Sequence, residues 1–402
     1  SLNKVVILYA CVGVLFLIAA AMFFFSKKVP AGITSEKVEK SNKALTLLLV
    51  LTVLLGVCFT PVFNSYKSEE AIKLEKLQAE YNLILEQLKP YSDTQLQTDV
   101  MAQVMIETRN NLSVEIKPLL DNLEYTRMYW LIAAFVAVIV VLLSALFFSK
   151  KSATGWGAMQ YPQLVLGMLA IFLYVGVEVA VGSNLGELLT LKEFGGLSSS
   201  EIAPYISMYW GSLMIGRWAG AVSVFKLSDA KKQLLIIVVP FIALAVIFGA
   251  NLIAKQDMSN LYYYFICVIF QIIALKVSKN KPARTLMVFA VFGMIAMFVG
   301  LITTGMVAIY AFLCGGLACS IIWPAIFNLS LLGLGKYTSQ GSAFLVMMIL
   351  GGGIIPPIQG KMSDIIGIHQ SYILSFLCFT YLFLFAIGVR KILLKQNINI
   401  DE

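Results

Sequence analysis

The stretch QLVLGMLAIFLYVGVEVAVGS, residues 163–183, decides the fold, because Glu178 is its single charged side chain. A transmembrane α-helix needs roughly 20 predominantly apolar residues to cross the hydrocarbon core of a bilayer. Comparable stretches occur at 5–25, 44–63, 129–148, 204–224, 233–253, 261–278, 285–303, 306–328, 339–359 and 371–389. The sequence therefore predicts an all-α, polytopic transmembrane helix bundle with about eleven spans.

The composition of the whole chain supports a membrane location. Hydrophobic residues make up 59% of the 402 residues and charged residues only 13%, a balance that excludes an ordinary soluble globular protein. The net charge is +8, but no compact basic region with interleaved aromatic side chains is present, so we expect no nucleic-acid partner. The lipid bilayer is the expected environment.

Lysine and arginine residues gather in alternate loops between the expected spans. The rich loops and the tail contain Lys27, Lys28, Lys37, Lys40, Lys43, Lys150, Lys151, Lys226, Lys231, Lys232, Lys279, Lys281, Arg284, Lys336, Arg390, Lys391 and Lys395. The short loops on the opposite side contain only isolated cations, Lys192, Lys255 and Lys361. Because the rich side is cytoplasmic in multi-pass proteins, we expect a cytoplasmic tail at 393–402 and a periplasmic segment at 64–128.

The segment 64–128 has a helical periodicity of its own. Apolar residues recur at helical spacing in two stretches, the first with Leu74, Leu77, Tyr81, Ile84 and Leu88, the second with Val100, Val104, Met105, Leu112 and Ile116. Pro90 separates the two stretches, so we expect an extramembrane helical hairpin between the spans 44–63 and 129–148. A solvated coiled-coil spacer is the favoured interpretation, with partner binding as the alternative.

No motif for catalysis, metal binding or nucleotide binding emerges from the sequence. All six cysteines lie in apolar stretches, and the single histidine, His369, is expected in a solvated loop, so neither a disulfide framework nor a metal site is indicated. The glycine run at 351–353 is not followed by Gly-Lys-Ser/Thr, and the chain has no Walker motif. Neither a nucleophile elbow nor a Ser-His-Asp order appears. We therefore expect no catalytic residues and no cofactor.

Three stretches carry a family resemblance. They are QYPQLVLGMLAIFLYVGVEVAVGSNLG (160–186), YISMYWGSLMIGRWAGA (205–221) and CSIIWPAIFNLSLLGLGKYTSQGSAFLVMMILGGGIIPPIQGKMSDIIGIH (319–369). They resemble the carboxyl-terminal half of the fucose/glucose/galactose–cation symporters of the major facilitator superfamily, as found in Bacteroidetes-type bacteria. The resemblance covers 160–228 and 284–392, with a weaker likeness of 1–30 to the last helix of the amino-terminal half.

The resemblance implies a division into domains. Residues 1–30 would be the last helix of the amino-terminal half and 160–392 the carboxyl-terminal half. The family's first five helices have no counterpart, so we expect a truncated start. Four spans are additional: one pair lies in 31–159 together with the periplasmic hairpin 64–128, and the other pair lies at 233–278. A paired insertion preserves the orientation of every later span.

The resemblance also implies a function. A member of this family would be a multi-pass protein of the bacterial inner (cytoplasmic) membrane. It would take up a neutral monosaccharide such as glucose, galactose or fucose with a proton or a sodium ion, by alternating access. The family associates proton coupling chiefly with acidic residues of the amino-terminal half. A non-transporting membrane sugar sensor and, more remotely, a membrane-embedded enzyme are the alternatives.

Two ionised side chains, Glu178 and Arg217, stand well inside the expected spans. A carboxylate in the bilayer costs at least about 2.5 kcal/mol on insertion scales, so Glu178 should face a cavity or a partner. We expect it to accept a hydrogen bond from a sugar hydroxyl or to bind the coupling cation, with a structural ion pair as the alternative. For Arg217, within the motif GRWAG, a gate or loop clamp is favoured over substrate contact.

Amide and aromatic side chains supply the other candidates for substrate binding. Asn184 offers a sugar both a donor and an acceptor, or else caps its helix end. Trp323 can stack on a pyranose while Asn328 contacts its hydroxyls, although interfacial packing would also explain the tryptophan. Gln340 is a weaker candidate at the cytoplasmic mouth. The helix with Gly351, Gly352, Gly353, Pro356 and Pro357 is expected to be flexible and closely packed, with freed carbonyls that could line the cavity.

Overall fold

The computed structural model describes residues 2–26, 39–91, 99–279 and 281–398. Lys27, Lys28 and Lys37 of the expected basic loop lie outside these residues, as does the end of the expected tail, 399–402. The chain divides into two units, 1–39 and 40–402, and each is described by itself. In the first unit, α1 (Leu2–Phe25) contains the first expected span and is apolar from Tyr9 to Phe25.

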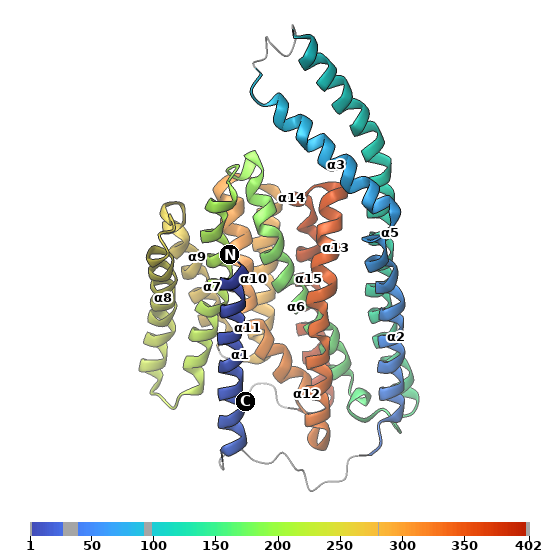
Figure 1. Cartoon of the computed structure of the whole chain (residues 1–402). Helices are drawn as coiled ribbons and strands as arrows, with labels where there is room; N and C mark the ends of the chain where they lie inside the picture. The colour runs from blue at the N-terminus through green and yellow to red at the C-terminus, as the bar shows by residue number, and fades with distance from the viewer. Residues whose placement is uncertain (1, 27–38, 92–98, 280, 399–402) are drawn as a thin grey trace. The chain divides into compact units, whose positions relative to one another are not determined.

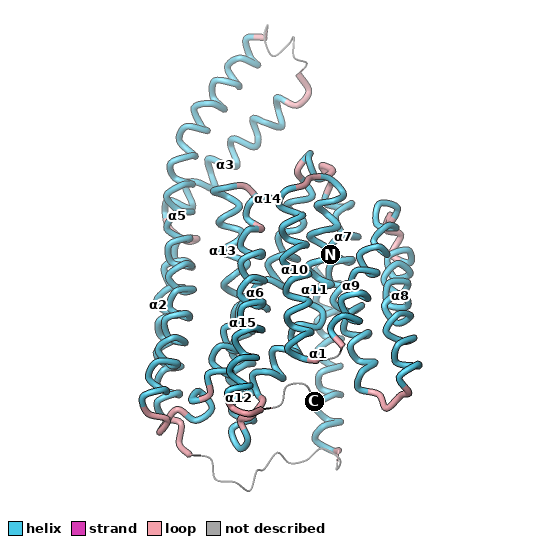
Figure 2. Tube along the Cα trace, turned by 180° about the vertical axis from the view of Figure 1, so that it is seen from behind, coloured by secondary structure: helices cyan, strands magenta, loops and turns pink. Residues whose placement is uncertain are grey.

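The second unit consists of helices, and no strand occurs in its described residues (Figure 2). Its α-helices are α2 (Asn42–Ser65), α3 (Glu69–Leu88), α5 (Val100–Lys151), α6 (Pro162–Thr190), α7 (Ser199–Ala221), α8 (Asp229–Ile253), α9 (Phe265–Ser278), α10 (Pro282–Ile302), α11 (Gly305–Leu331), α12 (Thr338–Met347), α13 (Gly351–Ile366), α14 (Ile368–Ser371) and α15 (Ile373–Lys395). Short 3₁₀ helices connect them: η1 (Gly157–Gln160), η2 (Lys192–Phe194), η3 (Val222–Val224), η4 (Ser259–Tyr264), η5 (Gly335–Tyr337) and η6 (Met348–Leu350).

Nine helical segments of the described residues are long and apolar enough to cross a membrane. They include α2, α5, α6, α8, α10 and α11, together with three composite segments: Ser259–Ser278, Gly335–Ile366 and Ile368–Lys395. The two remaining expected spans, 5–25 and 204–224, fall on α1 and α7. α7 carries several serines as well as Glu201 and Arg217, so its apolar character is interrupted. The expected all-α polytopic architecture is confirmed.

Helices α6 and α11 form the centre of the second unit. Most of the side chains of both helices are buried. α6 contacts α7, α11, α13 and α15, and α11 contacts α7 and α10 (Figure 2). A helix that is hydrophobic on all sides is expected to be enclosed by its neighbours. Peripheral helices such as α2 and α8 expose most of their apolar side chains, as lipid-facing helices do.

Local sequence signals explain several helix starts. A capping box begins α7, in which the backbone N–H of Ser198 donates to Glu201 Oε2 over 2.9 Å. Ser68 and Asp99 cap α3 and α5 by accepting backbone N–H groups of Ala71 and Met101. Pro162 occupies the first turn of α6, where its missing N–H costs no helical hydrogen bond.

The expected hairpin is formed by α3 and the first part of α5, which project beyond the bundle at one end (Figure 1). α5 is one uninterrupted helix of 52 residues. At 1.5 Å per residue this is roughly 78 Å, more than twice the thickness of the hydrocarbon core. The second arm of the hairpin and the span 129–148 therefore belong to a single continuous helix.

A small hydrophobic core holds the two arms together. It contains Ile84, Leu88 and Leu112, packed with Leu77, Tyr81, Met105, Ile106 and Ile116. This confirms most of the expected stripe, but Val100 and Val104 are 74% and 54% exposed, so their assignment to it was wrong. At 3.6 residues per turn, Val104 points away from the face that Met105 and Leu112 share.

Candidate functional site

The two ionised side chains that the sequence places inside the spans form an ion pair between α6 and α7. Arg217 Nη2 donates to Glu178 Oε1 over 2.8 Å. The Glu178 side chain is only 13% exposed, whereas that of Arg217 is 54% exposed. Since a carboxylate in a low-dielectric environment is costly unless it is paired, Arg217 explains how α6 accommodates Glu178.

Tyrosine side chains hold the backbone around Glu178 in place. The buried Tyr209 of α7 donates its hydroxyl to the Glu178 carbonyl oxygen over 2.7 Å. Gly182, one turn further along α6, permits this approach, because a Cβ there would lie 2.7 Å from the Tyr209 ring. Tyr174, one turn before Glu178, donates to the carbonyl of Cys319 in α11 over 3.1 Å. Contacts from α7 and α11 thereby fix this part of α6.

A cluster of aromatic side chains extends from Tyr174, near the ion pair of Glu178 and Arg217, along α11. The Trp323 ring meets the ring of Tyr174 edge-on, with centroids 5.8 Å apart. On α11 itself, Trp323 stacks with Phe327 at 6.1 Å. Trp323 and Phe327 are both half-buried. The expected sugar-stacking residue, Trp323, therefore contacts Tyr174, which lies one helical turn before Glu178 on α6.

A cavity of about 360 Å³ lies between α7, α9, α10 and α11. Its lining brings together two of the expected residues, Arg217 and Asn328, and adds the hydroxyl groups of Ser278, Thr285 and Ser320. Asn328 is exposed. The volume falls in the range of small-ligand pockets, roughly 300–1,000 Å³. Glu178 is linked to this cavity through its ion pair with Arg217.

Asn184 lies apart from this cavity. Its side-chain Nδ2 donates to the carbonyl of Ala180, four residues earlier in the same helix, over 2.9 Å. Its oxygen points toward α13, where it lies 3.9 Å from the position a Cβ would take at Gly360. The amide nitrogen is thus committed within α6, and the oxygen faces a different helix from the one that carries Arg217.

Gln340 also lies apart from the cavity and contacts loop residues of the protein. Its Oε1 accepts the backbone N–H of Ala158 in η1 over 2.7 Å. Its Nε2 donates to Ser41 Oγ, immediately before α2, over 2.7 Å. Both polar atoms of the Gln340 side chain therefore have partners, one just before α2 and the other just before α6.

The glycine and proline run lies in α13, where it faces α6. At Gly351 an added Cβ would lie 1.9 Å from the Phe172 carbonyl oxygen, and at Gly352 it would lie 3.1 Å from Val175. Gly353 faces open space. α13 continues through Pro356 and Pro357 to Ile366. Close approach of two backbones, which only glycine permits, explains Gly351.

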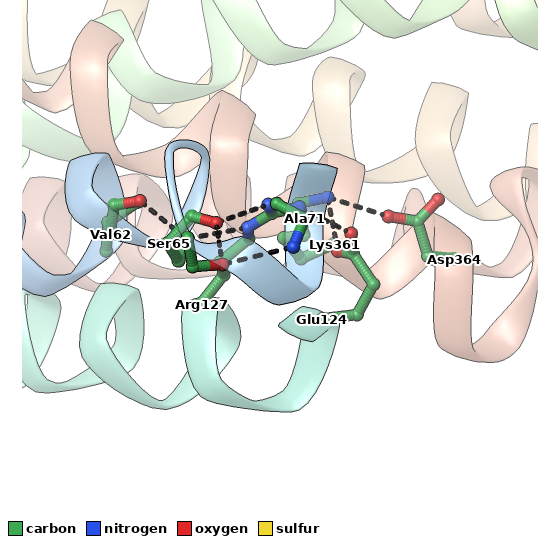
Figure 3. A network of polar contacts seen from close by, with 8 residues as sticks. Val62, Ser65, Ala71, Glu124, Arg127, Lys361 and Asp364 are labelled. Atoms are coloured by element: carbon green, nitrogen blue, oxygen red, sulfur yellow. Dashed lines mark hydrogen bonds and ion pairs between the residues drawn. The ribbon is translucent and has the colours of Figure 1, made fainter. Parts of the chain in front are cut away.

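A buried charge network, absent from the sequence-based expectations, joins α5 to α13 (Figure 3). Lys361, which the sequence analysis placed in a short loop, is inside α13 and pairs with Glu124 of α5 and with Asp364 at 3.1 Å. Glu124 also accepts from Arg127 Nη1 over 2.9 Å. We call these four residues the Lys361 network. Glu124 and Arg127 are 6% and 7% exposed.

Arg127 extends the network to α2. Its Nε donates to Ser65 Oγ over 2.8 Å (Figure 3). Its guanidinium lies 3.8 Å from the centre of the Tyr66 ring. α5 and α13 each contribute an i, i+3 pair of opposite charges: Glu124 with Arg127 on α5, and Lys361 with Asp364 on α13. This spacing is the one sequence signal that could have identified the network.

His369 differs from its expected solvated position. Its ring is half-buried and contacts the ring of Phe194 edge-on at 4.8 Å and that of Phe312 at 6.1 Å. Nε2 lies 2.7 Å from the Gly300 carbonyl oxygen. The rings of Phe194 and Phe312 account for the partial burial of the imidazole. His369 is a packing residue.

Comparisons with known proteins show which proteins the chain is similar to. No family model matches the chain. The chain is 33% identical over 233 residues to the glucose/galactose transporter of Brucella abortus biovar 1 (strain 9-941), a match that covers 58% of this chain and 43% of the relative. It is 28% identical over 246 residues to the putative glucose/galactose transporter of Helicobacter pylori (strain ATCC 700392 / 26695), covering 60% and 47%. The chain thus matches less than half the length of these relatives.

Further similarities are shorter or structural. The L-fucose-proton symporter of Escherichia coli (strain K12) is 35% identical over 111 residues, covering 27% of this chain and 25% of the relative. A crystal structure of the major facilitator superfamily transporter FucP in the outward conformation aligns at a TM-score of 0.41 with 20% identity, covering 84% and 69%. The sequence matches confirm the expected resemblance to transporters named for glucose/galactose and L-fucose. These relatives are named as transporters and symporters, which agrees with the expectation that the chain is not an enzyme.

Proposed function

We propose that the chain is part of a secondary active transporter that takes up a neutral monosaccharide, such as glucose, galactose or fucose, with a proton or a sodium ion. The observation that carries this proposal is the identity of 33% over 233 residues to a glucose/galactose transporter. The nine apolar helical segments of the described residues support multi-pass insertion. The location that we propose is the bacterial inner membrane.

We further propose that residues 160–392 form one half of the transporter, with inserted pairs in 31–159 and at 233–278. In transporters of this kind two halves enclose the substrate near the middle of the membrane and rock around it. In this arrangement α6, α7 and α11 form one wall of the substrate site.

The chemistry of the residues around Glu178 supports a sugar as substrate. Glu178 Oε1 accepts from Arg217, and a carboxylate oxygen has further lone pairs for a hydroxyl donor. The half-buried Trp323 contacts Tyr174, one helical turn before Glu178, and such an aromatic ring stacks on the apolar face of a pyranose. Asn328 and Arg217 share a cavity of about 360 Å³, which is large enough for a small ligand. We assign Asn184 and Gln340 secondary, mainly structural roles.

Coupling to a cation gradient is part of the proposal. The chain has no Walker motif, so direct use of ATP has no sequence support. A relative named as an L-fucose-proton symporter is 35% identical over 111 residues, which favours the proton over sodium. Glu178 is the coupling candidate that this chain offers, since it is the carboxylate nearest the middle of the central helix α6.

The test is flux across a sealed membrane. The full-length protein is reconstituted into proteoliposomes, and entry of radiolabelled glucose, galactose and fucose is compared with binding of the same sugars in detergent. We expect saturable entry of at least one of these sugars. Binding without entry would instead identify a membrane sugar sensor. If the protein neither binds nor admits any of these sugars, a monosaccharide substrate is excluded.

A further inference from the structure

The helix pair α2 and α5 is attached to one membrane crossing at both of its ends. That crossing runs from Gly335 to Ile366 and consists of η5, α12, η6 and α13. At the end near α12, Gln340 joins Ser41 before α2 to Ala158 in η1. At the other end, the Lys361 network joins α13 to α5 and α2. The two attachment points lie near opposite ends of the same crossing.

The attachment through Gln340 depends on a close approach of the backbone. Gly157 has a φ of +53°, and a Cβ there would lie 2.1 Å from Ser41 Oγ and 2.3 Å from Gln340 Oε1. A residue with a side chain could neither adopt this conformation easily nor leave room for the amide. The backbone N–H of Lys43 also donates to the Gly155 carbonyl over 3.0 Å, which fixes the start of α2 beside the segment that follows α5.

The attachment through the Lys361 network depends on buried charge. The side chains of Glu124 and Arg127 are 9% and 8% exposed, and that of Lys361 is 18% exposed. Separating such groups leaves an uncompensated charge in a low-dielectric environment, so the network resists any movement of α13 away from α5. Lys361 contacts a carboxylate on each side, Glu124 on α5 and Asp364 on its own helix.

Between the two attachment points the crossing is interrupted. The α-helical pattern stops at Met347, a 3₁₀ turn covers Met348–Leu350, and α13 starts at Gly351. Glycines at 351–353 and prolines at 356 and 357 follow directly. A 3₁₀ segment inside a longer helix and a run of glycines both mark a place where the backbone bends easily. A cavity of about 450 Å³ lies between α2 and α13, and Gly353 at the end of the break is one of its lining residues.

We propose that the inserted pair α2–α5 bridges the break and holds α12 and α13 in a fixed relative orientation, with Gln340 and Lys361 as positioning residues. The two ends of the crossing are fastened to the same external pair, while the interruption at Met348–Gly353 lies between them. Bending at Met348–Gly353 then requires that one attachment opens. The proposal concerns the mobility of this crossing and holds whether or not the protein transports sugar.

Amide hydrogen exchange of the full-length protein in lipid nanodiscs tests this proposal. We compare Gln340→Ala and Lys361→Met with wild type over the peptide that contains Met348–Gly353, using peptides from α10 and α11 as internal references. Loss of either attachment should accelerate exchange at the break about tenfold, the effect of roughly 1.4 kcal/mol of local stability, and leave the reference peptides unchanged. Lys361→Arg, which retains the charge, should exchange nearly as slowly as wild type.

Matched control variants are available at exposed positions on the same side of the bundle as Lys361. Lys192→Met and Gln370→Ala remove the same side-chain types from exposed positions and should leave exchange at the break unchanged. Unchanged exchange at the break in both Gln340→Ala and Lys361→Met would overturn the proposal. Equal acceleration of the break and the reference peptides would also overturn it, because the two residues would then be general stability contacts. If Lys361→Met does not fold, Gln340→Ala still tests the bridge on its own.

Discussion

Glu178 and Arg217 show how far a single residue can be interpreted from sequence. A lone carboxylate in an apolar run predicts a partner or a cavity, since an unpaired charge there is costly. The structure supplies both: Arg217 at 2.8 Å and, through Arg217, a cavity of about 360 Å³. The partner lies 39 positions away on another helix, so helical periodicity within α6 could not identify it.

The first prediction concerns Glu178→Gln. The variant should retain expression and weaken sugar affinity by roughly tenfold, since hydrogen bonds to charged groups contribute about 1.5–3 kcal/mol. Sugar binding and counterflow measure the affinity, and Glu193→Gln at an exposed position serves as the control. Loss of accumulation with intact counterflow would assign Glu178 to cation coupling instead. Lost expression that Glu178→Gln/Arg217→Gln restores would make the pair structural.

The second prediction concerns two neighbouring glycines in α13. Gly351→Ala should destabilise the protein by at least about 1–3 kcal/mol, because its methyl group would collide with the Phe172 carbonyl oxygen. Gly353→Ala, which faces open space, should be neutral or stabilising by about 0.5–1 kcal/mol, because alanine favours a helix. Thermal unfolding in detergent measures both variants. Equal transition temperatures would contradict the close packing of α13 on α6.

At the scale of elements, hydropathy and helical periodicity predicted most of the structure. The apolar stretches locate the helices because each apolar run must satisfy its own backbone hydrogen bonds in lipid. The sequence did not reveal that α5 continues from the hairpin through the membrane, since its charge pattern changes near Arg127 while its helical hydrogen bonding does not. Nor did it reveal the Lys361 network, because the pairing of Lys361 with Glu124 depends on how α5 packs on α13.

The third prediction concerns the hairpin of α3 and α5. Leu112 is in the small core between the two arms, so Leu112→Ala should destabilise the hairpin by about 2–5 kcal/mol. Limited proteolysis should therefore cleave α3 faster in this variant than in wild type. Val104→Ala alters an exposed residue on the same helix and should leave the cleavage rate unchanged. Identical rates in the two variants would mean that the arms do not depend on this core.

At the scale of the whole molecule, the distribution of lysine and arginine predicts the orientation in the membrane. The hairpin should be periplasmic and the carboxyl terminus cytoplasmic. In a background without the native cysteines, an impermeant maleimide applied to intact cells should label Glu80→Cys in α3 and spare Lys395→Cys at the end of α15. The reverse labelling pattern would invert the topology of every span.

The measurement that tests the central proposal most directly is accumulation of a monosaccharide against its own gradient. Proteoliposomes that contain the full-length protein are given an inward proton gradient or an inward sodium gradient, and internal radiolabelled glucose, galactose or fucose is followed over time. We predict that at least one sugar accumulates above its external concentration and that an ionophore which collapses the coupling gradient abolishes this excess. Sugar entry that is unaffected when both gradients are collapsed would contradict coupled transport.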